Sequence, residues 1–214
     1  MEAIQLHNVL PTVFRERDEI VSDVWHKEFV FERGKTYLVR ATSGTGKSSL
    51  CSYLTGQRSD YEGIICFDSR NVRTLTQKEW TQLRQTSLSH LFQDLRLFPE
   101  LTVLENICIK NNLTSHLKRK RIHELLERLG LADKAGVKAS HISIGQQQRV
   151  AFIRALAQPF DFLLLDEPVS HLDDANAAAM AQIALDECTQ RKAGLVVTSI
   201  GRDLPLTYDV TLQM

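Results

Sequence analysis

The stretch ATSGTGKS, which spans residues 41–48, decides the fold of this chain. It follows the apolar run TYLVRA at 36–41 and precedes a segment with the composition of a helix. Gly44 and Gly46 would let backbone N–H groups turn inward around phosphate oxygens, and the helix N-terminus would add partial positive charge. The order of strand, glycine-containing loop, Lys-Ser and helix therefore predicts a phosphate-binding loop.

Within this loop, individual residues are expected to hold the phosphates and a magnesium ion. Lys47 would reach the β- and γ-phosphates of a nucleotide, and the Ser48 hydroxyl would hold Mg²⁺. Ala41 stands where the pattern GxxxxGK[ST] has its first glycine. Alanine at this position destabilises the loop little as long as its φ is negative. The predicted phosphate contacts are Thr42, Ser43, Gly44, Thr45, Gly46, Lys47, Ser48 and Ser49.

A second apolar run, at 162–165, ends in the acidic pair Asp166-Glu167. In open α/β sheets the ligand lies beyond the carboxyl ends of the strands, so both acids are expected to face the phosphate-binding loop. Asp166 would hold Mg²⁺ through its water shell. Glu167 would polarise the water that attacks the γ-phosphate. The alternative is that the pair is only a polar exit from a buried strand.

Strands are also predicted at 4–9 and 195–197, besides those at 36–41 and 162–165. Two of the four runs, at 162–165 and 195–197, are continuously apolar, which is typical of parallel strands buried on both faces. Helical segments follow several of them, so we expect an α/β fold with a largely parallel sheet. The stretch 116–131 places apolar residues at helical spacing and indicates a mostly helical insertion in the second half of the chain. The basic run Lys118 to Arg121 is interpreted as a solvated helix face, with a lipid or nucleic-acid contact as the alternative.

Composition excludes few functions by itself. Lys+Arg and Asp+Glu are equal at 26 each, which argues weakly against binding of nucleic acid. The four cysteines form no CxxC pair and are expected to be free thiols of a reducing compartment. The N-terminus has no basic and apolar signal sequence, and no apolar run reaches the ~20 residues that a membrane-spanning helix needs. If the protein serves a membrane process, another chain is expected to supply the membrane part.

The sequence ISIGQQQRVA at 142–151 resembles the LSGGQQQRVA signature of the ABC-type ATPases. LFQD at 91–94 is similar to the Q-loop of that family, and SHLD at 170–173 to its D-loop. The segment at 92–107 looks most like the lipoprotein-release, macrolide-export and cell-division group. The resemblance implies a P-loop NTPase core with an antiparallel N-terminal β part and an inserted helical subdomain. It also implies a single domain over 1–214, with core at 1–93 and 158–214 and the subdomain at about 94–157.

Further site residues follow from this resemblance alone. Gln93 would contact Mg²⁺ or the attacking water, and an aromatic side chain, Phe14 with Val13 as the alternative, would stack on adenine. Ser199 stands where the family usually has a histidine that contacts the γ-phosphate, and Ile144 replaces the first glycine of the signature. The residues implied to bind the γ-phosphate of ATP on the opposite chain, or to act across the interface, are Ser143, Gly145, Gln146 and Asp173.

The expected protein is the ATP-binding subunit of an ABC transporter or related membrane machine, using ATP and Mg²⁺. Two such chains would bind ATP head to tail, and a homodimer is expected in preference to a heterodimer. An integral membrane permease would be the other partner, which places the chain on the cytoplasmic face of the cell membrane. Catalysis would rest on Glu167, Gln93 and Lys47. The alternative is a nucleotide clamp that binds ATP and dimerises without significant turnover, which Ser199 and Ile144 favour.

Overall fold

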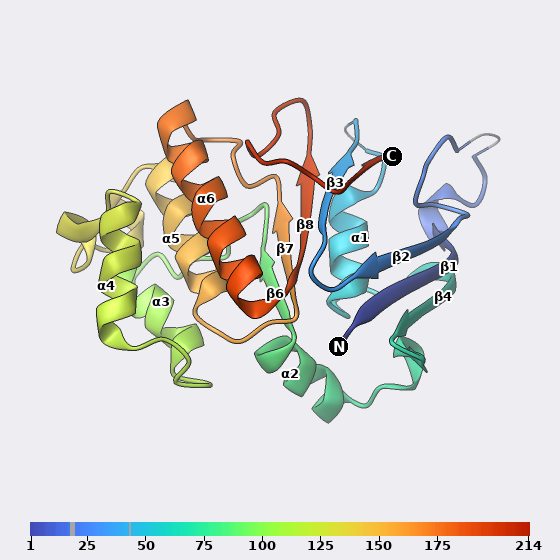
Figure 1. The fold of residues 1–214 in the computed structure, drawn as a ribbon, viewed down its shortest axis with the longest axis horizontal. Helices are drawn as coiled ribbons and strands as arrows, with labels where there is room; N and C mark the ends of the chain where they lie inside the picture. Colours follow the sequence, from blue (N-terminus) through green and yellow to red (C-terminus); the bar gives the residue numbers. More distant parts are fainter. Residues whose placement is uncertain (18–19, 43) are drawn as a thin grey trace.

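The computed structural model describes residues 1–17, 20–42 and 44–214. Its larger sheet is parallel throughout and occupies the middle of Figure 1. The strands of this sheet, in spatial order, are β6 (Leu88–Leu91), β7 (Phe162–Asp166), β8 (Gly194–Ser199), β3 (Thr36–Arg40) and β9 (Val210–Gln213). The predicted parallel core is confirmed. The order also brings together strands that lie far apart in the sequence.

The N-terminal part of the chain forms a second, antiparallel sheet, as predicted. Its strands, in spatial order, are β2 (Glu28–Glu32), β1 (Ala3–Pro11), β4 (Tyr61–Phe67) and β5 (Arg70–Asn71). Along β1, Ile4 and Leu6 are fully buried while Gln5 and His7 are not, so one face of this sheet turns toward the interior.

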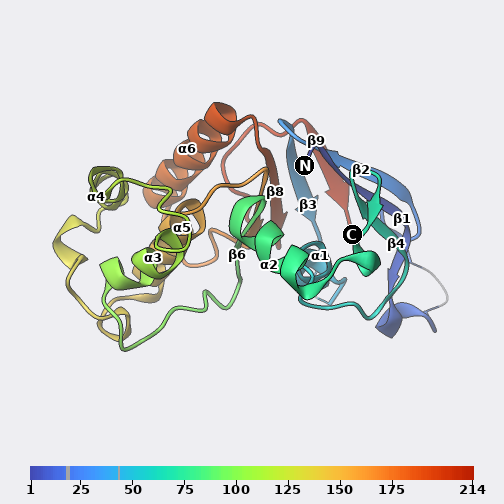
Figure 2. The same ribbon diagram turned by 90° about the horizontal axis from the view of Figure 1, so that it is seen from below.

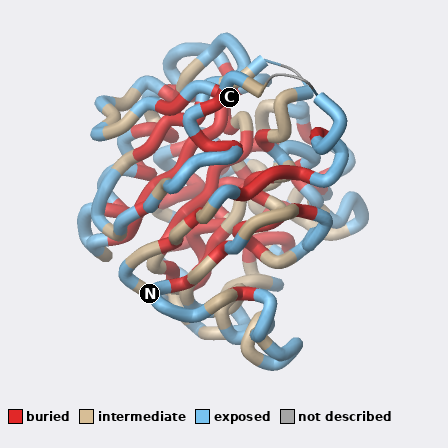
Figure 3. The backbone as a smooth tube through the Cα atoms, turned by 90° about the vertical axis from the view of Figure 1, so that its right-hand side faces the viewer, coloured by how far each residue is buried: buried red, intermediate tan, exposed pale blue. Residues whose placement is uncertain are grey.

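Helix α1 (Lys47–Leu54) lies between the two sheets, and α5 (Ile144–Leu156) and α6 (Asp174–Arg191) cover the other face of the parallel sheet (Figures 1 and 2). The residues of β7 alternate between these two layers. Leu164 belongs to the apolar cluster around α1, whereas Leu163 and Leu165 belong to the cluster around α5 and α6. A strand buried on both faces therefore explains the continuously apolar run. Figure 3 shows buried positions gathered along the central elements and exposed positions in the outer loops.

The helical insertion contains α3 (Val103–Asn111), α4 (Arg119–Arg128) and the signature helix α5. The helix predicted within 116–131 is α4, and its apolar residues Ile122, Leu125 and Leu126 are buried. Within the basic run, residues 118–120 are exposed. Arg121 instead forms ion pairs with Glu124 and the buried Glu187, so the run is mainly a solvated face. The extent of 94–157 for the subdomain stays a proposal.

All four predicted strands are present, but the sequence patterns missed β2, β4, β5, β6 and β9. Strand β6 is the most consequential of these because it leads directly to Gln93. Its sequence, LSHL, contains two polar residues, and Ser89 is accommodated because its hydroxyl donates to the carbonyl of Ala155. Helix α2 (Gln77–Thr86) precedes it and begins with a capping box between Thr76 and Glu79. No helix in the described part of the chain is long and apolar enough to cross a membrane.

Candidate functional site

The carboxyl ends of the parallel strands bring the predicted site residues to one edge of the sheet. Asp166, the last residue of β7, pairs with Thr198 of β8, and Arg40, the last residue of β3, pairs with Ser199. The phosphate-binding loop follows β3, and Glu167 follows β7 directly. Five separate segments of the sequence converge on a cavity of about 290 Å³. The cavity is lined by Val13, Phe14, Gly44, Gly46, Lys47, Ser48, Ser49, Gln93, Glu167 and Ile200.

The phosphate-binding loop depends on glycine at position 46. Gly46 has φ of 99° and is the N-cap residue of α1. A Cβ atom there would lie 3.1 Å from the Phe14 ring and 3.2 Å from the Trp25 ring. Trp25 also donates its indole N–H to the carbonyl of Thr45 at 2.9 Å, which holds the loop against the antiparallel part. Ala41 does not have a positive φ, so alanine is accommodated where the pattern has glycine.

The Lys47 side chain is 4% exposed and lies over the loop. Its ammonium donates to the carbonyl of Thr42 at 3.2 Å and lies 3.8 Å from the nearer carboxylate oxygen of Glu167. A buried ammonium needs such partners, and phosphate oxygens would replace them when a nucleotide binds. Ser43, which was also predicted to contact phosphate, lies outside the described residues.

Oxygen donors suited to Mg²⁺ gather beside this lysine. The Ser48 hydroxyl donates to the side-chain oxygen of Gln93 at 3.2 Å, so these two predicted ligands are already in contact. Asp166 is 3% exposed, and the Thr198 hydroxyl donates to one of its carboxylate oxygens. Hydroxyl, amide and carboxylate oxygens are the donors that Mg²⁺ prefers, so the residues present fit this ion. Ser48 and Gln93 would hold it directly, and Asp166 through water.

Glu167 adopts φ of 50°, which is uncommon for a residue other than glycine. The surrounding backbone holds it there. Its N–H lies 3.2 Å from both the carbonyl and the hydroxyl oxygen of Thr198, and its carbonyl accepts from the Gln148 amide at 3.1 Å. Burial raises the pKa of the Glu167 carboxyl, nearby Lys47 opposes this rise, and Asp166 adds to it. Such a carboxylate is a better proton acceptor than an ordinary surface glutamate.

The signature helix α5 begins away from this cavity. Ser143 is exposed and caps the helix by a reciprocal pair of hydrogen bonds with Gln146. A Cβ atom at Gly145 would lie 2.6 Å from the carbonyl oxygen of His171, so only glycine allows α5 to pack this closely on the D-loop. In the described chain, no residue of the signature lines the cavity at the phosphate-binding loop. Within one chain the exposed start of the signature, at Ser143 and Ile144, is thus separate from this cavity.

The D-loop is tied to both the signature helix and the acidic pair through Gln148. Its amide nitrogen donates to the Ser170 hydroxyl at 3.2 Å, and its amide oxygen accepts from the His171 backbone at 3.2 Å. Asp173 caps α6 by accepting from the backbone of Asn176. Gln148, Thr198 and Trp25 were missed as supporting residues. A signal existed for the first two, since Gln148 lies inside the signature at 142–151 and Thr198 lies between the predicted strand at 195–197 and Ser199.

Phe14 and Val13 differ in how much of each side chain can meet a nucleotide base. Phe14 is 5% exposed, and the Arg17 guanidinium lies 4.1 Å from its ring centre. Val13 is 67% exposed, and both residues line the cavity. The residue that contacts adenine therefore stays a prediction with these two candidates.

Ser199 ends β8 with only 1% of its surface exposed. Its hydroxyl is buried and has no hydrogen-bond partner among the described residues. It does not line the cavity, whereas the neighbouring Ile200 does. The side chain at position 199 is thus recessed behind the site where a phosphate would lie.

A phosphate-binding loop, strand-end acids and a separate signature helix on this fold define a nucleotide-binding cassette. The family model for the ABC transporter matches residues 26–170, and this chain belongs to that family. It is close to the lipoprotein-releasing group, as the segment at 92–107 indicated. It is 34% identical to the lipoprotein-releasing system ATP-binding protein LolD of Aquifex aeolicus, covering 86% of this chain and 83% of that protein.

Other relatives are also ATP-binding proteins of the ABC type. An uncharacterised ABC transporter ATP-binding protein of Mycobacterium tuberculosis, strain H37Rv, is 32% identical over 92% of this chain and 80% of its own length. Among solved structures, the post-hydrolysis dimer of the ATP-binding cassette MJ0796 with ADP and Pi superposes with a TM-score of 0.79. That match has 28% identity and covers 92% of this chain and 87% of the other.

Proposed function

We propose that this chain binds MgATP between two head-to-tail copies and hydrolyses it slowly to drive a separate membrane partner. One observation carries the proposal: the cavity at the phosphate-binding loop contains Lys47, Ser48, Gln93 and Glu167 but no residue of the signature. A second chain that presents its exposed Ser143 would complete the site. The dimeric state of the structural relative MJ0796 supports this arrangement.

The roles of the residues at the cavity are proposed from their surroundings, and the roles of those on the other copy from the family resemblance. The loop amides and Lys47 would neutralise the phosphates, and Ser48, Gln93 and Asp166 would hold Mg²⁺, which supplies charge compensation at the phosphates when bound. Glu167 would accept a proton from the attacking water, aided by its raised pKa. From the other copy, the helix N-terminus at Ser143, Gly145 and Gln146 would address the γ-phosphate. Asp173 would act across the interface.

Ser143→Arg is expected to abolish ATP-dependent dimerisation while leaving ATP binding to the monomer unchanged. The arginine side chain would occupy the space of the γ-phosphate bound to the other copy. Dimerisation is measured by light scattering, and binding by a fluorescent ATP analogue. Because losing the cap costs about 0.5–2 kcal/mol, the melting temperature is recorded as well.

Two further variants serve as controls for this experiment. Ser69→Arg adds the same side chain at an exposed position of the antiparallel sheet edge and should dimerise like the parent protein. Lys47→Ala should lose nucleotide binding itself. Undiminished ATP-dependent dimerisation of Ser143→Arg would rule out the shared site.

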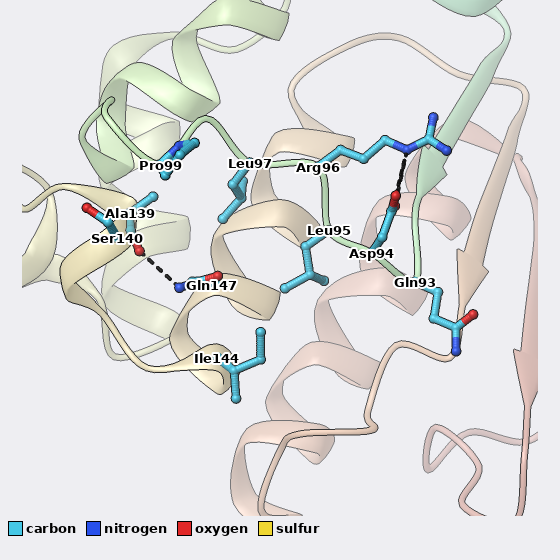
Figure 4. Close-up of a pocket in the computed structure, with 10 residues that line it drawn as sticks. All are labelled: Gln93, Asp94, Leu95, Arg96, Leu97, Pro99, Ala139, Ser140, Ile144 and Gln147. Carbon is cyan, nitrogen blue, oxygen red and sulfur yellow. Dashed lines mark hydrogen bonds and ion pairs between the residues drawn. The ribbon is translucent and has the colours of Figure 1, made fainter.

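A groove between the core and the helical subdomain supports a membrane-protein partner. It is a cavity of about 220 Å³ lined by Gln93, Asp94, Leu95, Arg96, Leu97, Pro99, Ala139, Ser140, Ile144 and Gln147 (Figure 4). Ile144 is 48% exposed there, and Phe98 at the adjoining loop is 53% exposed. Leu95, in the same segment, is 6% exposed and belongs to the core.

The groove is built on a segment with a fixed shape. Leu95 and Arg96 both have positive φ, and the Arg154 guanidinium donates to the carbonyl oxygens of both. Gln93, which contacts Ser48, begins this segment. A partner seated in the groove would therefore be connected to the proposed magnesium site by a few residues of backbone. We propose that the partner is an integral membrane permease, which places this chain at the cytoplasmic face of the membrane.

Phe98→Cys carrying a crosslinker is expected to capture, in cells, a protein whose own sequence contains membrane-spanning segments. Ser69→Cys, on the antiparallel part, serves as the matched position and should not capture it. Phe98→Asp should weaken co-purification of the same protein. Capture of soluble proteins alone from position 98 would contradict a membrane partner.

The second candidate function is a nucleotide clamp that closes around ATP and does not turn it over. The recessed side chain of Ser199 favours it, since a preorganised donor to the γ-phosphate is missing there. The raised pKa of Glu167 and the contact between Ser48 and Gln93 favour hydrolysis. Steady-state ATP turnover with the partner present separates the two functions.

A further inference from the structure

A second group of potential ligands lies beneath the edge of the parallel sheet. A sulfur atom of Cys51, a ring nitrogen of His90 and a carboxylate oxygen of Asp166 all lie within 4.8 Å of one another. They come from α1, β6 and β7. The proposed hydrolysis of ATP uses only Asp166, so Cys51 and His90 have no role in it.

The fold brings these three residues together through the backbone. His90 pairs with Leu164 across β6 and β7, and Asp166 lies two residues beyond Leu164, on the same face of the sheet. Helix α1 packs on that face. Cys51 follows Lys47 by four residues, so it lies one helical turn deeper on the same side of α1. All three positions are on regular elements, which makes the arrangement rigid.

The surroundings of His90 leave its polar atoms without a partner. Both ring nitrogens are buried, and neither has a hydrogen-bond partner among the described residues. Leaving a buried polar group in this condition destabilises the fold, and a bound ligand would offset that cost. Because neither ring nitrogen has a partner in the described part of the chain, the imidazole can offer a nitrogen lone pair to a metal.

We propose that Cys51, His90 and Asp166 form a binding site for a thiophilic divalent cation of the zinc class. One sulfur, one nitrogen and one oxygen donor match the mixed ligand sets of such ions, with a fourth, open position for water. Binding would release the thiol proton of Cys51 to solvent and form a metal–thiolate bond. The thiolate and the carboxylate together would then balance the two positive charges of the ion.

Two features of the surroundings fit this site. The Thr198 hydroxyl donates to one oxygen of Asp166, which orients the carboxylate and leaves the other oxygen available. Cys51 is fully buried, so its thiol is shielded from larger reagents.

The proposed Cys51–His90–Asp166 site would share Asp166 with the magnesium site proposed for the bound nucleotide. A zinc-class ion held there would withdraw this carboxylate from the water shell of Mg²⁺ and weaken MgATP binding. This competition rests on the proposed function. The metal site itself does not, because it can be measured without nucleotide.

The test is titration of the nucleotide-free protein, stripped with a chelator, with Co²⁺ as a spectroscopic probe and with Zn²⁺ as its competitor. One equivalent of Co²⁺ should produce a thiolate charge-transfer band and the visible bands of tetrahedral cobalt, and Zn²⁺ should remove both. Cys51→Ala and His90→Gln should each lower the affinity at least about 10-fold, since even loss of an outer-shell partner costs about 10–100-fold. Circular dichroism establishes that each variant is folded.

Cys188→Ala, which removes another buried thiol, and His123→Gln, on α4, are the matched controls and should bind Co²⁺ like the parent protein. Lack of a thiolate band in the parent protein would overturn the site. So would binding that persists unchanged in both Cys51→Ala and His90→Gln. Co²⁺ binding that MgATP does not weaken would contradict the proposed role of Asp166 with nucleotide and leave the metal site standing.

Discussion

Glu167→Gln is expected to reduce ATP turnover by about 10²–10⁴-fold, the range that general acid–base groups typically contribute. The amide keeps the size of the side chain and cannot accept a proton from water. Lys47 and the loop amides remain, so ATP should still bind and the two copies should stay closed around it. Phosphate release measures turnover, and size-exclusion chromatography with ATP detects the trapped dimer.

The same residue predicts how turnover depends on pH. Burial raises the pKa of the Glu167 carboxyl, so it takes up a proton at a higher pH than an ordinary glutamate would. Turnover should therefore fall as pH is lowered through this raised pKa, and Glu167→Gln should lose this acid limb. Glu127→Gln, on the exposed face of α4, serves as the control. Residual turnover that survives Glu167→Gln unchanged would show that another group activates the water.

Ser199→His is expected to raise ATP turnover by about 10²–10³-fold, because one preorganised donor to developing negative charge is typically worth this much. Serine is short, and Ser199 is 1% exposed, behind the cavity that Ile200 lines. An imidazole from the same backbone position would extend toward the γ-phosphate. ATP affinity should change little, since Lys47 and the loop amides hold the ground-state phosphates.

Ser199→Ala provides the matched comparison. It should have the same slow turnover as the parent protein, because the serine hydroxyl does not line the cavity. The melting temperature shows whether the larger side chain is tolerated in so buried a place. Rapid turnover of the parent protein that Ser199→Ala leaves unchanged would mean that no donor is missing. His171 of the D-loop would then be the next candidate for the contact.

Local sequence patterns predicted the parts of the site whose chemistry is contained in a few consecutive residues. Gly46, Lys47 and Ser48 form a loop between a strand and a helix, and the acids at 166–167 follow a buried strand. Because parallel strands place their carboxyl ends on one edge, these segments could be expected to meet. The α/β class and the antiparallel N-terminal part were likewise predictable from the motifs and their resemblance to a family.

Contacts between distant segments could not be predicted in this way. Strand β6 carries no strong apolar pattern, and only its pairing with β7 turns His90 toward Cys51 and Asp166. The register of β7 and β8 likewise sets Thr198 against the two acids.

Whether a side chain is buried or accessible also had to come from packing. Leu95 turns into the core while Phe98 stays exposed, although both are apolar residues of one short segment. The sequence by itself determined which chemical groups the protein carries and near which strand ends they lie. Only the tertiary structure decided their partners and exposure, because side-chain burial and strand register depend on residues that are remote along the chain.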